Sequence, residues 1–168
     1  MNPLSRHRQT GASRLEIGVV IFILTIVAGW LLHTMHFYQE LAEKTSVEAT
    51  AMNMRSGLRL KIADLIVKGN LEQQREFAKT NPVQFLEHLP AGYLGEMKTP
   101  GILPPGSWYF DQNSAELVYI PKLSSNLLIE TPASVANGIS LRWQIRQANI
   151  SSGFSFVDVE LVTSYKWF

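Results

Sequence analysis

Residues 15–32 decide the fold of this chain, and they read LEIGVVIFILTIVAGWLL. From Ile17 to Leu32 no residue carries a charge, and residues 34–38 add only histidine and further uncharged length. A helix needs about 20 predominantly apolar residues to cross the hydrocarbon core of a bilayer. The segment 15–38 therefore predicts one membrane-spanning helix, and the more polar remainder predicts a single globular domain.

Charged residues on the two sides of this segment predict its orientation. Arginines precede the uncharged run and mostly acidic residues follow it: Arg6, Arg8 and Arg14, then Glu40, Glu43, Lys44 and Glu48. Basic residues favour the cytoplasmic side of a membrane. We therefore expect a cytoplasmic N-terminus and a globular domain on the other side. A cleaved secretory signal is the weaker interpretation, because no small-residue cleavage site follows the apolar run.

The residues before the apolar run form a second pattern. A short, polar and basic stretch ends at Gly11, and Glu16 follows five residues later, at the edge of the apolar helix. A carboxylate at such a place is costly to put in lipid, so it is expected to have a partner or a function. The complete pattern resembles the N-terminal signal of type IV pilins and of the pseudopilins of type II secretion.

This resemblance implies a processing step and a mode of assembly. A prepilin peptidase would cut after Gly11, which makes residues 1–11 a leader and Ala12 the methylated mature N-terminus. Glu16 would be the assembly carboxylate, pairing with the ammonium group of a neighbouring subunit and setting the axial register. The resemblance also implies an inner-membrane protein with a periplasmic domain. The mature start Ala-Ser-Arg-Leu, in place of the family's usual phenylalanine, favours a minor pilin or pseudopilin.

The helix is predicted to continue well beyond the membrane segment. Apolar residues follow one another in steps of three or four at Val47, Ala51, Met54, Leu58, Ile62 and Leu65. This spacing places them on one helix face, and Gly69-Asn70 is a typical C-terminal stop. We expect one helix over residues 12–68, with an apolar membrane half and an amphipathic half that covers the globular domain. A long coiled coil is the alternative, but the stripe covers only about three heptads.

Residues 69–168 predict the globular domain. Residues 71–88 are expected to be helical with a break at Asn81-Pro82, and the proline- and glycine-rich residues 90–106 are expected to form a loop. Alternation and turn residues predict strands at 107–111, 116–120, 139–145 and 157–161. Phe154 and Phe156 fall on the opposite phase of the last strand, which predicts a bulge or a second contact face. The fold class is therefore α+β: the long helix packed on a small antiparallel sheet, as in pilins.

The sequence contains few residues in patterns typical of a catalytic or metal site. The chain has no cysteine, which excludes disulfides and thiol catalysis, and no basic cluster suited to binding nucleic acid. No phosphate-binding loop or catalytic motif occurs, so we expect no enzyme, no cofactor and no metal site. His33 and His36 are interpreted as interfacial helix residues. Asp111 and Asn113 are interpreted as turn formers, because two oxygen ligands do not make a calcium site.

The C-terminal residues Tyr165-Lys166-Trp167-Phe168 are interpreted as an exposed aromatic tail that packs on a neighbouring subunit. The expected function is that of a structural subunit of a type IV pilus or type II secretion filament. Its expected partners are a prepilin peptidase, other pilin or pseudopilin subunits and the inner membrane, and no nucleic acid. The alternative is a single-span, membrane-anchored periplasmic interaction protein that is neither processed nor assembled into filaments. A membrane-anchored enzyme is the third interpretation.

Overall fold

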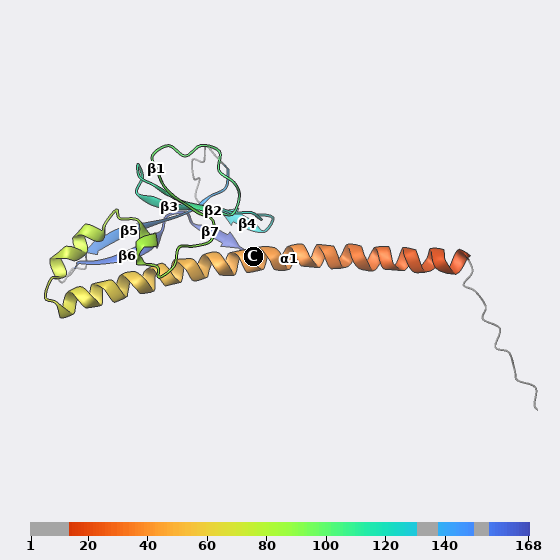
Figure 1. The fold of residues 1–168 in the computed structure, drawn as a ribbon, viewed down its shortest axis with the longest axis horizontal. Helices are drawn as coiled ribbons and strands as arrows, with labels where there is room; N and C mark the ends of the chain where they lie inside the picture. Colours follow the sequence, from red (N-terminus) through yellow and green to blue (C-terminus); the bar gives the residue numbers. More distant parts are fainter. Residues whose placement is uncertain (1–13, 131–137, 150–154) are drawn as a thin grey trace, which may run out of the picture. The chain divides into compact units, whose positions relative to one another are not determined.

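The computed structural model describes residues 14–130, 138–149 and 155–168. The chain divides into two compact units, Met1–Gln39 and Glu40–Phe168. The first unit contributes the apolar part of helix α1. The second contains the rest of that helix together with every strand of the described residues (Figure 1). It also holds the hydrophobic core.

Helix α1 runs over Arg14–Val67, 54 residues, as the apolar run and the stripe together predict. Its C-terminal end is a Schellman motif. The Asn70 N–H donates to the Leu65 carbonyl over 3.0 Å and the Gly69 N–H donates to the Ile66 carbonyl over 3.1 Å. Gly69 has a φ of +72°, the left-handed conformation that glycine adopts without steric cost. The predicted stop at Gly69-Asn70 is therefore confirmed.

The predicted stripe of α1 is the face that packs on the sheet. Met54 and Leu58 are fully buried, and Val47, Ala51 and Leu65 are nearly so, while Ile62 is half-buried. Opposite them lie the apolar side chains of the strands, among which Trp108 stacks on Trp143 with 5.2 Å between ring centroids. Burial of this apolar surface is the dominant stabilising term of the second unit.

The main sheet has five strands in the order β1-β2-β3-β5-β6. The strands are β1 Tyr93–Met97, β2 Ser107–Asp111, β3 Glu116–Ile120, β5 Leu141–Asn149 and β6 Ser155–Leu161. The predicted hairpin is β2–β3, and the two further predicted strands are β5 and β6. The sheet is mostly antiparallel, but β1 pairs with β2 in parallel. The expectation of a purely antiparallel sheet, with a loop throughout 90–106, is therefore wrong at residues 93–97.

Two short strands form a second, antiparallel sheet: β4 Leu127–Ile129 and β7 Tyr165–Trp167. No pattern in the sequence predicts β4, because three residues are too few to show a period. The pairing turns Trp167 into the core, where 2% of its surface is exposed. The interpretation of residues 165–168 as an exposed tail is therefore wrong for Trp167, whereas Phe168 keeps 37% of its surface exposed.

The region 71–88, predicted to be helical with a break, forms two 3-10 segments, η1 Leu71–Phe77 and η2 Pro82–Phe85. The predicted break is present: the Asn81 side chain accepts the Val83 N–H over 3.1 Å, with Pro82 at the first position of η2. A glycine of α1 allows η2 to lie close to the helix. A Cβ added at Gly57 would collide with the Phe85 carbonyl oxygen, so only glycine permits this approach.

Strands β5 and β6 pair in one uninterrupted register from Trp143↔Leu161 to Asn149↔Ser155. The expected bulge is absent from this described pairing. Phe156 lies opposite Ala148 and is 44% exposed, because it is on the sheet face that α1 does not cover. Phe154 lies outside the described residues. Of the two predicted explanations for the phase of Phe156, a bulge or a second contact face, the structure shows that Phe156 is on the second face of the sheet.

Candidate functional site: the faces of helix α1

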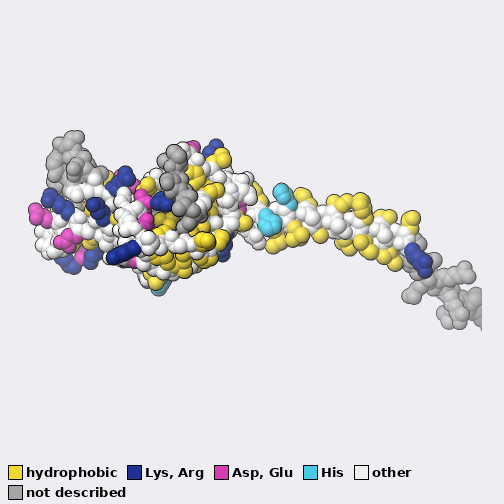
Figure 2. Space-filling model, turned by 90° about the horizontal axis from the view of Figure 1, so that it is seen from above, with side chains coloured by type: hydrophobic (Ala, Val, Ile, Leu, Met, Phe, Trp, Pro, Cys, Tyr) yellow, Lys and Arg dark blue, Asp and Glu magenta, His cyan; other side chains and the backbone are white. Residues whose placement is uncertain are grey.

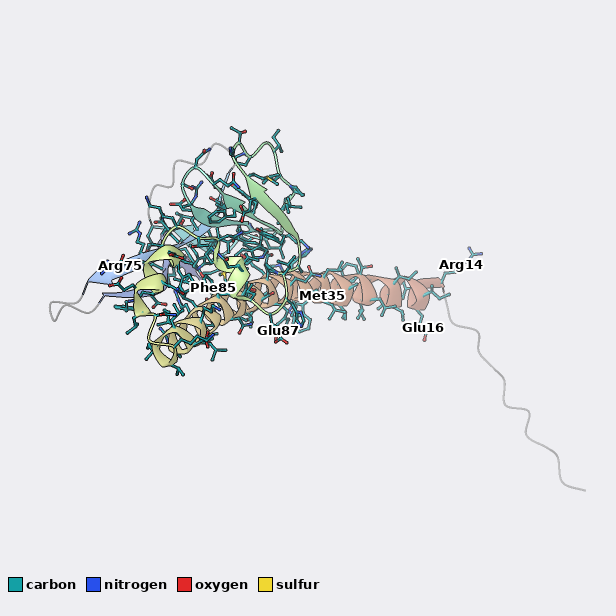
Figure 3. All side chains as sticks on the ribbon, turned by 60° about the vertical axis from the view of Figure 1, so that its left-hand side comes forward. Arg14, Glu16, Met35, Arg75, Phe85 and Glu87 are labelled. Carbon is teal, nitrogen blue, oxygen red and sulfur yellow. The ribbon has the colours of Figure 1, made fainter. Side chains whose placement is uncertain are left out.

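The start of α1 carries the predicted assembly carboxylate. Arg14 is the first described residue, Glu16 is in the first helical turn, and both are exposed. Figure 3 shows that the two side chains point to opposite sides of the helix. Gly11 and Ala12, the predicted processing residues, lie outside the described residues.

The apolar segment follows directly. A stretch of 18 residues in α1 has a mean hydropathy of 2.5, and none of these residues is buried within the chain. Figure 2 shows hydrophobic side chains all along this segment. Exposed apolar surface of this extent is unfavourable in water and requires a membrane or a protein partner. The helix is long and apolar enough to cross a membrane.

A second stripe of α1 lies opposite the buried one. Eight residues follow one another in steps of three and four and carry no charge; we call them the outward stripe: Ala42, Thr45, Ala49, Met52, Ser56, Leu60, Ala63 and Val67. All are exposed except Ala49, which is half-buried. Leu60 and Val67 leave 74% and 87% of their surfaces exposed. A helix face turned to water is ordinarily polar and charged.

The charged residues of this part of α1 lie on the two flanks, between the buried stripe and the outward stripe. They are Lys44, Glu48, Arg55 and Arg59 on one flank, and Glu43, Lys61, Asp64 and Lys68 on the other. Lys68 pairs with Asp64 on the same flank at 2.7 Å, and Arg59 pairs with Asp158 of β6 at 3.4 Å. The outward stripe is thus a continuous uncharged strip that is suited to packing against another apolar or small-residue surface.

Sequence reasoning missed the outward stripe although the signal was present. The same counting in steps of three and four that finds Val47 to Leu65 also finds Ala42 to Val67. Small and hydroxyl residues such as Ala49 and Ser56 do not register as apolar, so a search for large hydrophobic residues overlooks them. The informative signal is the lack of charge on the face opposite the core.

Two carboxylates of α1 hold the helix to the rest of the second unit. Glu43 accepts three hydrogen bonds: from the Tyr119 hydroxyl at 2.7 Å, the Lys122 N–H at 2.6 Å and the Leu123 N–H at 3.1 Å. Burial, followed by this hydrogen bond and the charge of Glu43, raises the pKa of Tyr119 above its usual range. The hydroxyl therefore stays protonated and continues to donate.

Glu40 lies one turn before Glu43 and is 3% exposed. It accepts the Asn126 N–H at 2.8 Å, the Asn126 side-chain amide at 2.9 Å and the Trp167 indole N–H at 3.1 Å. Burial acts to raise the pKa of Glu40, but the bonds from Asn126 and Trp167 outweigh burial and hold it below its usual value. We call Glu40 and Glu43 the carboxylate clamp; it joins α1 to residues 122–126 and to β7.

The described residues that could bind a metal ion do not lie together at one site. Within residues 14–130, 138–149 and 155–168, no group of three His, Cys, Asp or Glu side chains is placed to hold a metal ion. His33 and His36 are both exposed on α1. The Asp111 carboxylate accepts the Asn113 N–H and the Ser114 hydroxyl, each at 2.9 Å, which closes the β2–β3 turn.

Comparisons with protein-family models, with curated proteins and with solved structures gave no match for this chain. Its function is therefore inferred from its own residues and their arrangement.

Proposed function

We propose that this chain is a non-enzymatic structural subunit of a type IV pilus or a type II secretion filament, most closely suited to the role of a minor pilin or pseudopilin. The outward stripe is the observation that supports this proposal most directly. Over Ala42 to Val67 the face of α1 opposite the core has no charged residue. Together with the apolar segment, this leaves α1 with surface suited to packing on other helices along its length. A long apolar N-terminal helix packed on a β-sheet is compatible with a pilin-like fold.

In this proposal residues 15–38 store the subunit in the inner membrane, with the N-terminus in the cytoplasm and the globular unit in the periplasm. A prepilin peptidase removes residues 1–11. The subunit is then drawn out of the bilayer as α1 exchanges lipid for neighbouring helices. The exchange is feasible because packed apolar side chains replace lipid tails at little hydrophobic cost.

Glu16 supplies the register of the assembly. Inside a helix bundle a lone carboxylate is strongly disfavoured, as is the ammonium group that cleavage creates at Ala12. Pairing Glu16 of one subunit with the N-terminus of the next relieves both penalties at one axial offset only. The exposed position of Glu16 in the first turn of α1 supports this role.

The first test is the mass of the N-terminal peptide after expression of the full chain with and without an active prepilin peptidase. We expect a chain that begins at N-methylated Ala12 when the peptidase is present. A chain that still begins at Met1 would overturn the proposal and favour the unprocessed, membrane-anchored interaction protein.

The second test is Glu16→Ala, with Glu72→Ala in η1 as the exposed control. We expect Glu16→Ala to be inserted in the membrane at wild-type levels but to reduce the filaments sheared from cells about hundredfold, because the unpaired N-terminal charge blocks docking. Glu72→Ala should leave the filament yield unchanged. Normal filaments from Glu16→Ala would falsify the register role.

A further inference from the structure

Helix α1 carries two opposite charges at its start, and they lie on different sides of the helix. Arg14 and Glu16 are two residues apart, so an α-helix turns them about 200° from each other. Figure 3 shows the two side chains on opposite sides. Residues two apart on a helix do not face each other. Arg14 and Glu16 therefore meet different neighbours when α1 is surrounded by other helices.

The charges at this end of the chain do not balance once the leader is removed. Cleavage creates an ammonium group at Ala12. The start of the mature chain then holds two cations, this ammonium group and Arg14, against one carboxylate, Glu16. The next charged residue is Glu40, 24 residues after Glu16. Pairing of Glu16 with the ammonium group of a neighbour therefore leaves one guanidinium group per subunit in excess.

The membrane tolerates this excess cation, but a helix bundle does not. Arg14 precedes the apolar run, and a long side chain at the edge of the hydrocarbon reaches the headgroups. The cytoplasmic side of a membrane also favours basic residues. Inside a helix bundle neither headgroups nor water reach the guanidinium group, and its burial without a counter-charge is strongly disfavoured. Arg14 therefore requires a carboxylate when the subunit passes from the membrane to the filament.

The side of α1 that carries Arg14 is open to a close neighbour. Both glycines of the apolar segment, Gly18 and Gly29, lie on this side. They follow Arg14 in steps of four, four, three and four residues, through Phe22 and Thr25, which is the spacing of one helix face. A Cβ added at either glycine would meet no described atom outside the helix within 4 Å. Small residues let the backbones of membrane helices approach closely, so a neighbour on this side passes near Arg14.

A second copy of this chain does not balance the charge of Arg14. Each copy brings one carboxylate to this level, Glu16, and two cations. A row of identical copies therefore accumulates one unpaired cation per subunit, which disfavours their assembly. A different subunit restores the balance if its helix carries more carboxylates than cations at this level. The glycines alone identify no partner, but Arg14 specifies the charge that the partner must bring.

We propose that Arg14 forms an ion pair with a carboxylate of a different pilin-type subunit, on the side of α1 opposite Glu16. In this arrangement Glu16 sets the axial register and Arg14 selects the neighbour. A helix with an additional carboxylate is accepted, and a second copy of this chain is disfavoured. This inference rests on the proposed filament function and adds the kind of subunit that lies beside this one, in agreement with the role of a minor subunit.

The test is the incorporation of Arg14 variants of the full chain into filaments of cells that carry all their other pilin subunits. The measured quantity is the amount of this chain in sheared filaments divided by the amount of cleaved chain in the membrane. Both are quantified by immunoblot, with cleavage checked by intact mass. Arg14→Met removes the charge but keeps a long side chain, and we expect incorporation to fall about hundredfold. Arg14→Lys keeps the charge and should retain most of the wild-type incorporation.

A variant that moves the cation is the matched control for its position. Arg14→Met combined with Leu15→Arg keeps the total charge and the leader, but it turns the cation about 100° around α1. We expect this variant to be excluded from filaments as strongly as Arg14→Met. Wild-type incorporation of either variant, or equal loss of Arg14→Lys, would overturn the ion pair while leaving the filament function intact. Absence of the wild-type chain from filaments would defeat both proposals.

Discussion

At the scale of single residues, the carboxylate clamp has the largest energetic consequence. Glu40 is a charged residue in the core, and such a group is tolerated only when hydrogen bonds replace its lost hydration. The backbone N–H and side chain of Asn126 and the indole of Trp167 supply those bonds. The clamp therefore fixes where α1 meets the rest of the second unit, and it anchors the C-terminal strand at the same point.

Glu40→Gln tests the clamp. The amide oxygen can still accept the Asn126 N–H and the Trp167 indole N–H, but the NH2 group then faces the Asn126 side-chain amide, which is also a donor. We therefore expect the free energy of unfolding at pH 7 to fall by about 1–3 kcal/mol. Thermal unfolding of the fragment 36–168 measures this loss. Glu48→Gln, at a side chain that is 45% exposed, is the control and should change stability by no more than about 0.5 kcal/mol.

The same clamp predicts a pH dependence of stability. The pKa of Glu40 is lower in the folded chain than its ordinary value of 4.5. A lowered pKa gives stability that is fully present above the ordinary value and is lost as the pH falls through the folded value. We expect the melting temperature of the wild type to fall more steeply below pH 4.5 than that of Glu40→Gln. Parallel curves for the two proteins would contradict this role.

At the scale of elements, α1 has two opposite faces without charged residues, the buried stripe and the outward stripe. The buried stripe packs on the sheet, and the outward stripe carries no charge, which is why we propose that it packs on a partner. A carboxylate placed within the outward stripe should therefore block assembly without unfolding the chain, whereas one placed on a charged flank should not.

Leu60→Glu and Ile66→Glu test this difference. Both residues are exposed, at 74% and 55%, but Leu60 belongs to the outward stripe and Ile66 lies on a flank. We expect Leu60→Glu to lower filament yield about hundredfold, because assembly would bury an unpaired charge, and Ile66→Glu to retain most of it. Equal losses in both variants would show that any added charge on α1 disturbs assembly.

At the scale of the whole molecule, the two units differ in whether their apolar side chains are buried within the chain. The described core residues all belong to Glu40–Phe168, so we expect this unit to fold without a membrane. The described apolar segment of Met1–Gln39 contributes none of them, and its exposed side chains need lipid or neighbouring helices.

We therefore expect the fragment 36–168 to be soluble and cooperatively folded. Removing Trp167 and Phe168 from it should lower the free energy of unfolding by about 3–5 kcal/mol or more, as expected for loss of a buried tryptophan. Size-exclusion chromatography and thermal unfolding measure both properties. A truncated fragment as stable as the parent would mean that Trp167 is not part of the core.

Much of this architecture follows from local periodicity. The apolar run and the spacing of Val47 to Leu65 predict α1 nearly to its last residue, because helix faces repeat every three to four residues and Gly69 ends the last turn. The alternation of apolar and polar residues around Trp143 and Val159 predicts β5 and β6, because successive side chains of a strand point to opposite faces. The assembly role of Glu16 stays a prediction, made from its place relative to Gly11 and the apolar run.

Only the tertiary structure decides the features that depend on distant residues. In the sequence Glu40 is one of several carboxylates of α1, and only the fold brings Asn126 and Trp167 to it. Trp167 is predicted to be exposed from the sequence, and only the pairing of β7 with β4 buries it. The parallel partner of β2 arises in the same way. In each case the deciding contact joins residues far apart in the chain, and no local pattern records which of many such contacts will form.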